Sequence, residues 1–362
     1  MTNTTRLLPR ALMLLTVAVT LLGGLGAGLA RLGWPMDALS RNWILVHGPL
    51  MIGGFLGTLI CLERAVALAP RYGWALAVPV VNALGALALL LARDAIPARL
   101  LITLGSAGLV LLFGLMLRLH PSRDIAIMAL GALCWLVGNA LWLGGRPIFS
   151  VVHLWVAFLI LTIVGERLEL SRVRRLTPLS VRLLVLATGV YLLGVLLTVA
   201  DLGAGIRLSG GGAVLMAAWL LRYDIARQTI RQTGLPRYVA ACLLVGYVWL
   251  GFGGLIALWQ GAVYAGPAYA TLLHAYLLGF VFSMIFGHAP IILPAITGLK
   301  IAYTPLFYAP LVVLHVTLAY RMYGNLAGNM AARQAGALWN ALAIVLFLAL
   351  MAVVIRRSNR PA

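Results

Sequence analysis

The sequence predicts an all-α polytopic membrane protein with about twelve transmembrane helices. Of its 362 residues, 63% are hydrophobic and only 10% are charged, and the mean hydropathy is +1.04. Such values are typical of membrane-spanning chains and not of soluble domains. The connections between the apolar segments are short, so we expect residues 1–362 to form a single integral membrane domain surrounded by lipid.

Twelve apolar segments are each long enough to cross a hydrocarbon core of about 30 Å as a helix. Their expected extents are 11–32, 43–68, 74–92, 98–118, 124–144, 149–170, 181–201, 205–222, 237–261, 267–295, 303–323 and 335–355. The eighth segment is the weakest prediction because it contains Arg207 and three glycines at 210–212. The first segment follows Arg6 and Arg10 and ends in small residues at 27–30, which also fits a cleavable signal peptide; a retained helix is the main expectation.

The chain carries a formal net charge of +19. In a soluble protein this charge would favour nucleic acid as a partner. Here the arginines lie between apolar segments, where they act as topology signals and contact anionic lipid headgroups, so no nucleic-acid partner is predicted. The sequence contains no Walker loop, no dinucleotide-binding fingerprint and no hydrolase triad, so nucleotide-driven transport is not supported either.

The loop charges predict the orientation of the chain. Alternate loops, together with both tails, hold most of the basic residues. One cluster of Arg222, Arg227, Arg231 and Arg237 lies in and beside the loop 223–237. Cytoplasmic loops carry such an excess of Lys and Arg. We therefore predict a multi-pass protein of the bacterial inner (plasma) membrane with both termini in the cytoplasm.

In this orientation, four of the six histidines lie at a similar depth near the outer side of the membrane. The second, sixth and tenth segments enter from the outer face and carry His47, His153 and His274 near their starts, and the eleventh segment places His315 in its outer half. Histidines inside apolar segments usually face a bundle interior, a cavity or a cofactor. Taken singly, each is explained equally well as a hydrogen-bonded packing residue.

The recurrence of histidines on every fourth segment predicts an internal repeat. Three arcs of four helices, in a pseudo-threefold arrangement, would cover roughly residues 1–120, 121–235 and 236–362. Four imidazoles in one layer could bind a metal ion or hold a haem from two sides. No thiolate or carboxylate falls in that layer, which argues against structural zinc.

A second set of ionisable residues lies in the inner halves of the same three segments. The second and sixth segments close with Glu63 and Glu166, each followed by an arginine, and the tenth closes with His288. These three residues are candidates for a proton path. The alternative for each Glu-Arg pair is an ion pair at the membrane interface.

The helix count and the histidine layout resemble the haem-copper oxidase and nitric oxide reductase superfamily. Within residues 272–294 (LLHAYLLGFVFSMIFGHAPIILP), the HA, LGF and GHAP elements are also similar to the NnrS membrane proteins, which contain haem and copper. The resemblance covers most of the chain but rests on layout, without a long specific motif.

The resemblance implies a set of ligands. In that superfamily one histidine from helix two and one from helix ten hold the low-spin haem, positions matched here by His47 and His274. His153 would fall where a copper-site histidine lies, and with His315 it would form a second, metal-binding set. The seventh segment has no histidine and the tenth has no His-x-His pair, which favours a haem-binding relative over a terminal oxidase.

The leading interpretation is a protein of nitric oxide or respiratory metabolism, or of electron transfer from quinol, that binds haem b; whether it also binds copper is left open. Whether it is a membrane oxidoreductase is left open. The alternatives are a proton-coupled secondary transporter, with His288, Glu63 and Glu166 along its path, and a structural or assembly subunit of a respiratory complex.

Overall fold

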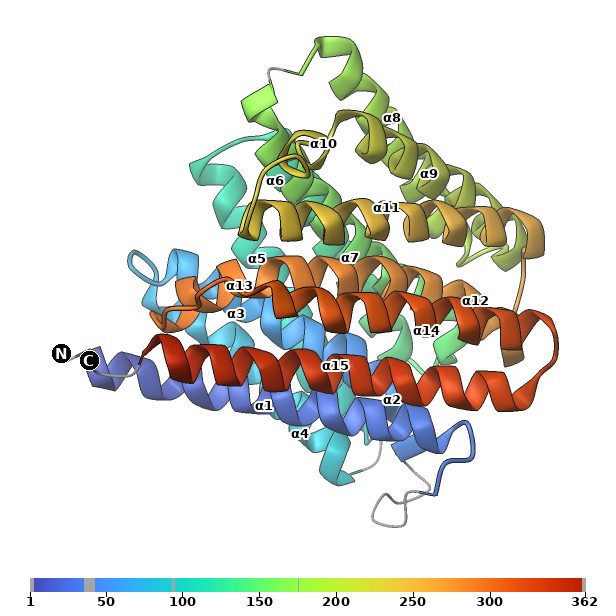
Figure 1. Ribbon diagram of the computed structural model, residues 1–362, viewed down its shortest axis with the longest axis horizontal. Coiled ribbons are helices and arrows are strands. Elements are labelled where there is room, and N and C mark those ends of the chain that lie inside the picture. The colour runs from blue at the N-terminus through green and yellow to red at the C-terminus, as the bar shows by residue number, and fades with distance from the viewer. Residues whose placement is uncertain (1–2, 36–42, 93–94, 175, 360–362) are drawn as a thin grey trace. The chain divides into compact units, whose positions relative to one another are not determined.

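The structure of the protein is a computed structural model that describes residues 3–35, 43–92, 95–174 and 176–359. Within these residues it consists of helices and connecting turns, with no β-strand (Figure 1). Twelve spans are long and apolar enough to cross a membrane, as the sequence predicts. They are Leu12–Ala30, Ile44–Leu68, Gly73–Leu91, Ile96–Leu119, Arg123–Leu143, Ile148–Leu170, Pro178–Leu197, Leu202–Tyr223, Leu235–Gln260, Gly266–Thr297, Pro305–Leu326 and Met330–Ser358. The protein is therefore an all-α, multi-pass membrane protein.

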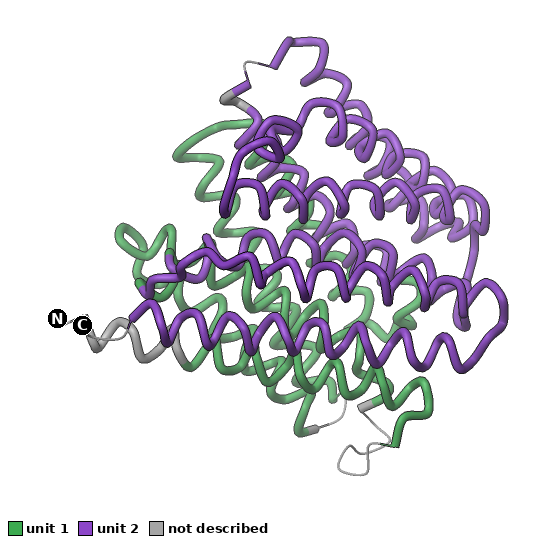
Figure 2. The backbone as a smooth tube through the Cα atoms, in the orientation of Figure 1, with its two compact units in different colours: residues 1–151, 295–298 green, residues 152–294, 299–362 purple. Residues whose placement is uncertain are grey.

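The chain divides into two compact units (Figure 2). The first comprises residues 1–151 and 295–298, and the second comprises residues 152–294 and 299–362. The division into three arcs of four helices, with boundaries near residues 120 and 235, stays a prediction.

The first unit contains the first five spans. Its elements are α1 (Asn3–Ala30), α2 (Trp43–Pro49), η1 (Leu50–Gly57), α3 (Thr58–Leu68), η2 (Gly73–Leu76), α4 (Ala77–Ala92), α5 (Ile96–Leu119) and α6 (Arg123–Leu143). Helices α1 and α4 pack on η1, and α5 packs between α4 and α6. A proline in the first turn of α5, where its missing N–H costs nothing, helps to start that helix.

The second unit contains most of the sixth and tenth spans and all of the other five that follow the fifth. Its elements are α7 (Ile148–Leu170), η3 (Ser171–Arg174), α8 (Pro178–Leu197), α9 (Leu202–Tyr223), α10 (Ala226–Thr229), α11 (Leu235–Gln260), α12 (Gly266–His274), η4 (Ala275–Phe282), α13 (Ser283–Thr297), η5 (Pro305–Phe307), α14 (Tyr308–Leu326) and α15 (Met330–Ser358). Helix α11 packs on both α9 and η4. Side-chain oxygens of Thr177, Asp201 and Asn329 accept hydrogen bonds from the first turns of α8, α9 and α15 and so cap these helices.

Pairs of consecutive helices form tight antiparallel hairpins, namely α4 with α5, α8 with α9, and α14 with α15 (Figure 1). Small residues allow the close approach. A Cβ at Gly85 would meet the Ile102 backbone nitrogen at 2.9 Å, and one at Gly336 would meet the Arg321 backbone at 2.9 Å. Small residues at such contacts are what holds membrane helices together, because lipid provides little hydrophobic drive for their association.

Among the described residues, two spans are interrupted in their interior by wide helical turns, which the sequence does not predict. The segments η1 in the second span and η4 in the tenth are π-helical and almost entirely buried. Pro49, directly before η1, has no N–H to donate, which gives a local reason for the first departure. Such wide turns are rare and often lie at functional sites.

Candidate functional sites

His47, three residues before η1, is held in one orientation by α1. Its Nδ1 lies 2.7 Å from the Gly24 carbonyl oxygen, and its ring lies against Gly28, where a Cβ would come within 2.8 Å of Cε1. Because a carbonyl can only accept, Nδ1 carries the proton and Nε2 carries the electron pair. Metal-binding histidines are typically oriented by such a bond from the other ring nitrogen.

His274, the last residue of α12, has the same tautomer. Its Nδ1 donates to the Ala270 carbonyl oxygen at 2.7 Å, and its Nε2 accepts from Nη2 of Arg321 at 3.3 Å. Arg321 lies on α14, is only 9% exposed and has the positive charge of Arg333 nearby. Among the described residues no carboxylate forms an ion pair with Arg321, so two neighbouring cations lack a negative partner.

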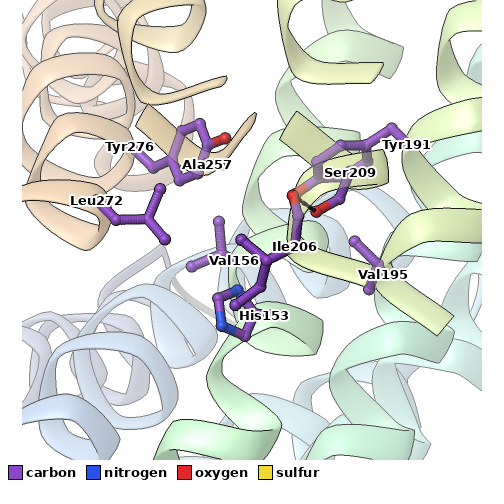
Figure 3. A pocket seen from close by; sticks show the side chains of 9 residues that line it. All are labelled: His153, Val156, Tyr191, Val195, Ile206, Ser209, Ala257, Leu272 and Tyr276. Atoms are coloured by element: carbon purple, nitrogen blue, oxygen red, sulfur yellow. Dashed lines mark hydrogen bonds between the residues drawn. The ribbon is translucent and has the colours of Figure 1, made fainter. Parts of the chain in front are cut away.

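His153, on α7, lines a small cavity in the second unit (Figure 3). The side chain is 6% exposed, and its Nε2 has no hydrogen-bond partner in the described part of the chain. The other lining residues are Val156, Tyr191, Val195, Ile206, Ser209, Ala257, Leu272 and Tyr276. The cavity measures about 10 Å³, which is roughly the space that one water molecule needs.

His315, on α14, has both ring nitrogens occupied. Trp249 donates from Nε1 to Nδ1 at 2.9 Å, Nε2 donates to the Ser283 hydroxyl at 2.9 Å, and Ser283 donates on to the Gly279 carbonyl oxygen at 2.8 Å. To bind a metal, His315 would have to give up the Trp249 bond. In the described residues, no three His, Cys, Asp or Glu side chains lie together as a metal-binding group. The second, metal-binding set of His153 and His315 stays a prediction.

The predicted proton-path residues fall in both units. His288, on α13, donates from Nδ1 to the Met284 carbonyl oxygen at 2.7 Å, and it lies within electrostatic range of Glu166 and Arg167 on α7. Glu63 belongs to the first unit, where one of its neighbours is Arg64, with a nitrogen-to-oxygen distance of 3.7 Å. His288 and Glu166 are thus brought together within the second unit.

Asp224, directly after α9, is a buried carboxylate that the sequence patterns do not single out. Its Oδ1 accepts from the backbone nitrogen of Ala226 at 2.7 Å. Arg174 donates from Nη1 to the Tyr223 and Asp224 carbonyl oxygens at 2.6 and 3.0 Å and so caps α9. Burial raises the pKa of the Asp224 carboxyl above its usual range, although Arg167 partly opposes this shift.

Two residues that the sequence predictions omitted could have been recognised from the sequence. Arg321 is an arginine inside the predicted eleventh span, where a charge is costly and therefore informative. Asp224 is one of eight acidic residues in the whole chain. Trp249 and Ser283 had no such signal, because single tryptophans and serines are common in membrane helices.

The comparison with known families covers almost the whole chain. Residues 10–356 match the model of a family described as Domain of unknown function (DUF8744). No curated protein matches the sequence. The chain therefore belongs to the DUF8744 family.

Proposed function

We propose that this protein binds b-type haem in the bacterial inner membrane, with both termini cytoplasmic and with His47 and His274 as axial ligands. Its role would lie in nitric oxide or respiratory metabolism, or in electron transfer from quinol. The observation that supports the proposal is the shared tautomer of these histidines. Each donates from Nδ1 to a main-chain carbonyl oxygen at 2.7 Å, which directs the electron pair to Nε2.

The ligand requirement of haem agrees with what the chain offers. The porphyrin supplies four of the six positions on the iron, so the protein needs to provide only one or two imidazoles. Separate, well-anchored imidazoles on π-interrupted spans meet this requirement. A site made of protein ligands alone would need three or four side chains in one place.

Arg321 gives a second reason for the proposal. Haem carries two carboxylate groups, and a buried cation without a negative partner is costly. Arg321 is buried beside His274, and Arg333 adds a second positive charge. Haem binding would give both cations a negative partner, provided that Arg321 turned from Nε2 of His274 toward a carboxylate.

The proposal covers haem alone, because copper at His315 would have to displace the Trp249 hydrogen bond. Haem iron would supply the capacity to bind a small gas or to carry one electron. The residues of the chain would hold the imidazoles in place and neutralise the carboxylates.

The absorbance spectrum of the purified protein tests this proposal. Cells supplied with a haem precursor should yield a protein with an intense Soret band and sharp bands after reduction. A colourless protein, purified folded from the same cells, would overturn it.

A proton-coupled secondary transporter is the second candidate. It is favoured by a group of ionisable residues in the second unit, where the buried Arg167 lies within electrostatic range of both Asp224 and His288. A colourless protein that takes up protons together with a solute in proteoliposomes would favour this candidate.

A further inference from the structure

A group of polar side chains is buried at the end of the second unit that the arginine pattern predicts to be cytoplasmic. Arg167 on α7 is 2% exposed, and Asp224 after α9 and Tyr247 on α11 are fully buried. Arg167 lies three residues before the end of α7, and Asp224 directly follows the end of α9. Two helix ends therefore place Arg167 and Asp224 next to the predicted inner surface, and Tyr247 contacts both of them from α11.

The polar atoms of this group lie close together, but several of them lack a well-aligned hydrogen bond among the described residues. The Tyr247 hydroxyl lies beside both Asp224 and Arg167 without a well-aligned hydrogen bond to either. Oδ2 of Asp224 and Nε of Arg167 also lack a partner of good geometry in the described part of the chain. An acceptor, a donor and a hydroxyl that can do both are what a bridging water requires.

Arg167 also lies near His288, whose imidazole can act as a base. Both Arg167 and Glu166 are within electrostatic range of His288. His288 donates from Nδ1 to the Met284 carbonyl oxygen, so its Nε2 can accept a proton. Arg167, which stays protonated, is thus the fixed charge that Asp224 and His288 share.

We propose that Asp224 and His288 form a buried proton-exchange site around Arg167, served by water from the cytoplasmic side. In the exchange the O–H bond of the Asp224 carboxylic acid breaks and an N–H bond forms at Nε2 of His288. The Tyr247 hydroxyl and bridging water carry the proton between them. The products are a carboxylate paired with Arg167 and an imidazolium beside Glu166.

The charges around Asp224 and His288 favour the products of the exchange. The transfer forms one carboxylate and one imidazolium, and each gains an oppositely charged neighbour that offsets part of its desolvation cost. Before the transfer Arg167 has a neutral acid as its neighbour, and afterwards it has a carboxylate. The groups that face Asp224 are Arg167, Tyr247 and Arg174, and those that face His288 are Arg167 and Glu166.

The pKa of Asp224 is consistent with this role. Burial keeps the acid form in place to a higher pH than is usual for an exposed aspartate. An aspartate whose only function were to cap Ala226 would act best as a permanent carboxylate. Its buried position instead makes a change of protonation possible.

Infrared spectroscopy during a pH titration of the full-length protein tests the proposal. The wild type should show a carbonyl band of a buried protonated carboxyl group, which is lost in Asp224→Asn and kept in Asp201→Asn, an exposed helix cap. Incorporation of ¹³C-aspartate into the wild type should shift the same band, which keeps the test valid if Asp224→Asn does not fold. A band that persists in Asp224→Asn, or that does not shift with the label, would overturn the proposal.

Two further variants separate exchange from a purely structural ion pair. His288→Gln should raise the midpoint of the Asp224 band by about one pH unit, or about tenfold in dissociation constant, because the proton loses its internal acceptor. Tyr247→Phe should keep the midpoint and slow the exchange. A midpoint unchanged by His288→Gln would mean that Asp224 titrates alone and would overturn the site. The readout does not depend on haem, so it can fail independently of the proposed function.

Discussion

The second and tenth spans contain the same departure from α-helical geometry, stabilised in different ways. In each, a histidine precedes a buried π-helical segment of eight residues, η1 or η4, and a hydroxyl residue follows it directly. In the first unit, Asn82 on α4 donates to the Thr58 hydroxyl and to the Gly53 carbonyl oxygen, both at 2.8 Å. The segment is thus held by an amide that does not titrate.

In the second unit the corresponding partner is an imidazole. Ser283 accepts from His315 and donates to the Gly279 carbonyl oxygen, and Trp249 completes the network. In both units the partner comes from the next span along the chain, α4 or α14. The comparison teaches that a polar side chain from a neighbouring helix can support a π-helical segment, and that an amide and an imidazole can both play this part.

The inner ends of the two spans also differ. Five residues beyond the hydroxyl stand Glu63 in the first unit and His288 in the second. Glu63 lies 3.7 Å from Arg64, and its side chain is 27% exposed. His288 lies near the buried charge of Arg167 and near the half-buried Glu166. The inner end of the tenth span therefore places an ionisable residue near a buried charge, whereas Glu63 at the inner end of the second span is partly exposed.

The largest effect, on the haem spectrum, is expected when the histidines that precede the π-helical segments are replaced. If haem is bound as proposed, His47→Ala and His274→Ala should each abolish the low-spin spectrum or the haem itself, because an axial imidazole is lost. His120→Ala, at an exposed helix end, is the matched control and should leave the spectrum unchanged. An unchanged bis-imidazole spectrum in both His47→Ala and His274→Ala would show that the ligands lie elsewhere.

Added methyl groups should destabilise both π-helical segments. A Cβ at Gly57 would meet the Trp135 ring at 2.5 Å, and one at Gly279 would collide with Trp249. Gly57→Ala and Gly279→Ala should each lower the free energy of unfolding by about 1–3 kcal/mol, measured by denaturant titration in detergent. Gly73→Ala, which meets no atom within 4 Å, should have little effect. Equal stability of all three variants would mean that the close contacts are dispensable.

The two hydroxyl residues should differ in importance. Ser283→Ala leaves the His315 Nε2 donor without its partner and should cost about 1–3 kcal/mol. Thr58→Val leaves Asn82 its bond to the Gly53 carbonyl oxygen and should cost only about 0.5–1.5 kcal/mol. The same unfolding measurement compares them, and a larger loss for Thr58→Val would reverse the comparison.

The smallest effect concerns the pH dependence of stability at the inner end of the second unit. Because the pKa of Asp224 is raised in the folded protein, its contribution to stability is complete below the unfolded pKa of about 3.9. This contribution is lost as the pH rises through the folded pKa, by at most about 1.4 kcal/mol per pH unit. Asp224→Asn should flatten this part of the profile, whereas Asp201→Asn should not. A wild-type stability that rises with pH over this window would contradict the assignment.

The sequence by itself determined the twelve spans, because the free energy of placing a segment in lipid is a sum over its own residues and needs no knowledge of its neighbours. It also placed His288 and Glu166 toward the same predicted side. What only the tertiary structure decided is which side chains meet. Asp224 and Arg167 are separated by 57 positions, and His274 and Arg321 by 47. Hydropathy does not encode which face of a helix meets which neighbour. The π-helical segments, the histidine tautomers and the buried charge group all depend on that choice.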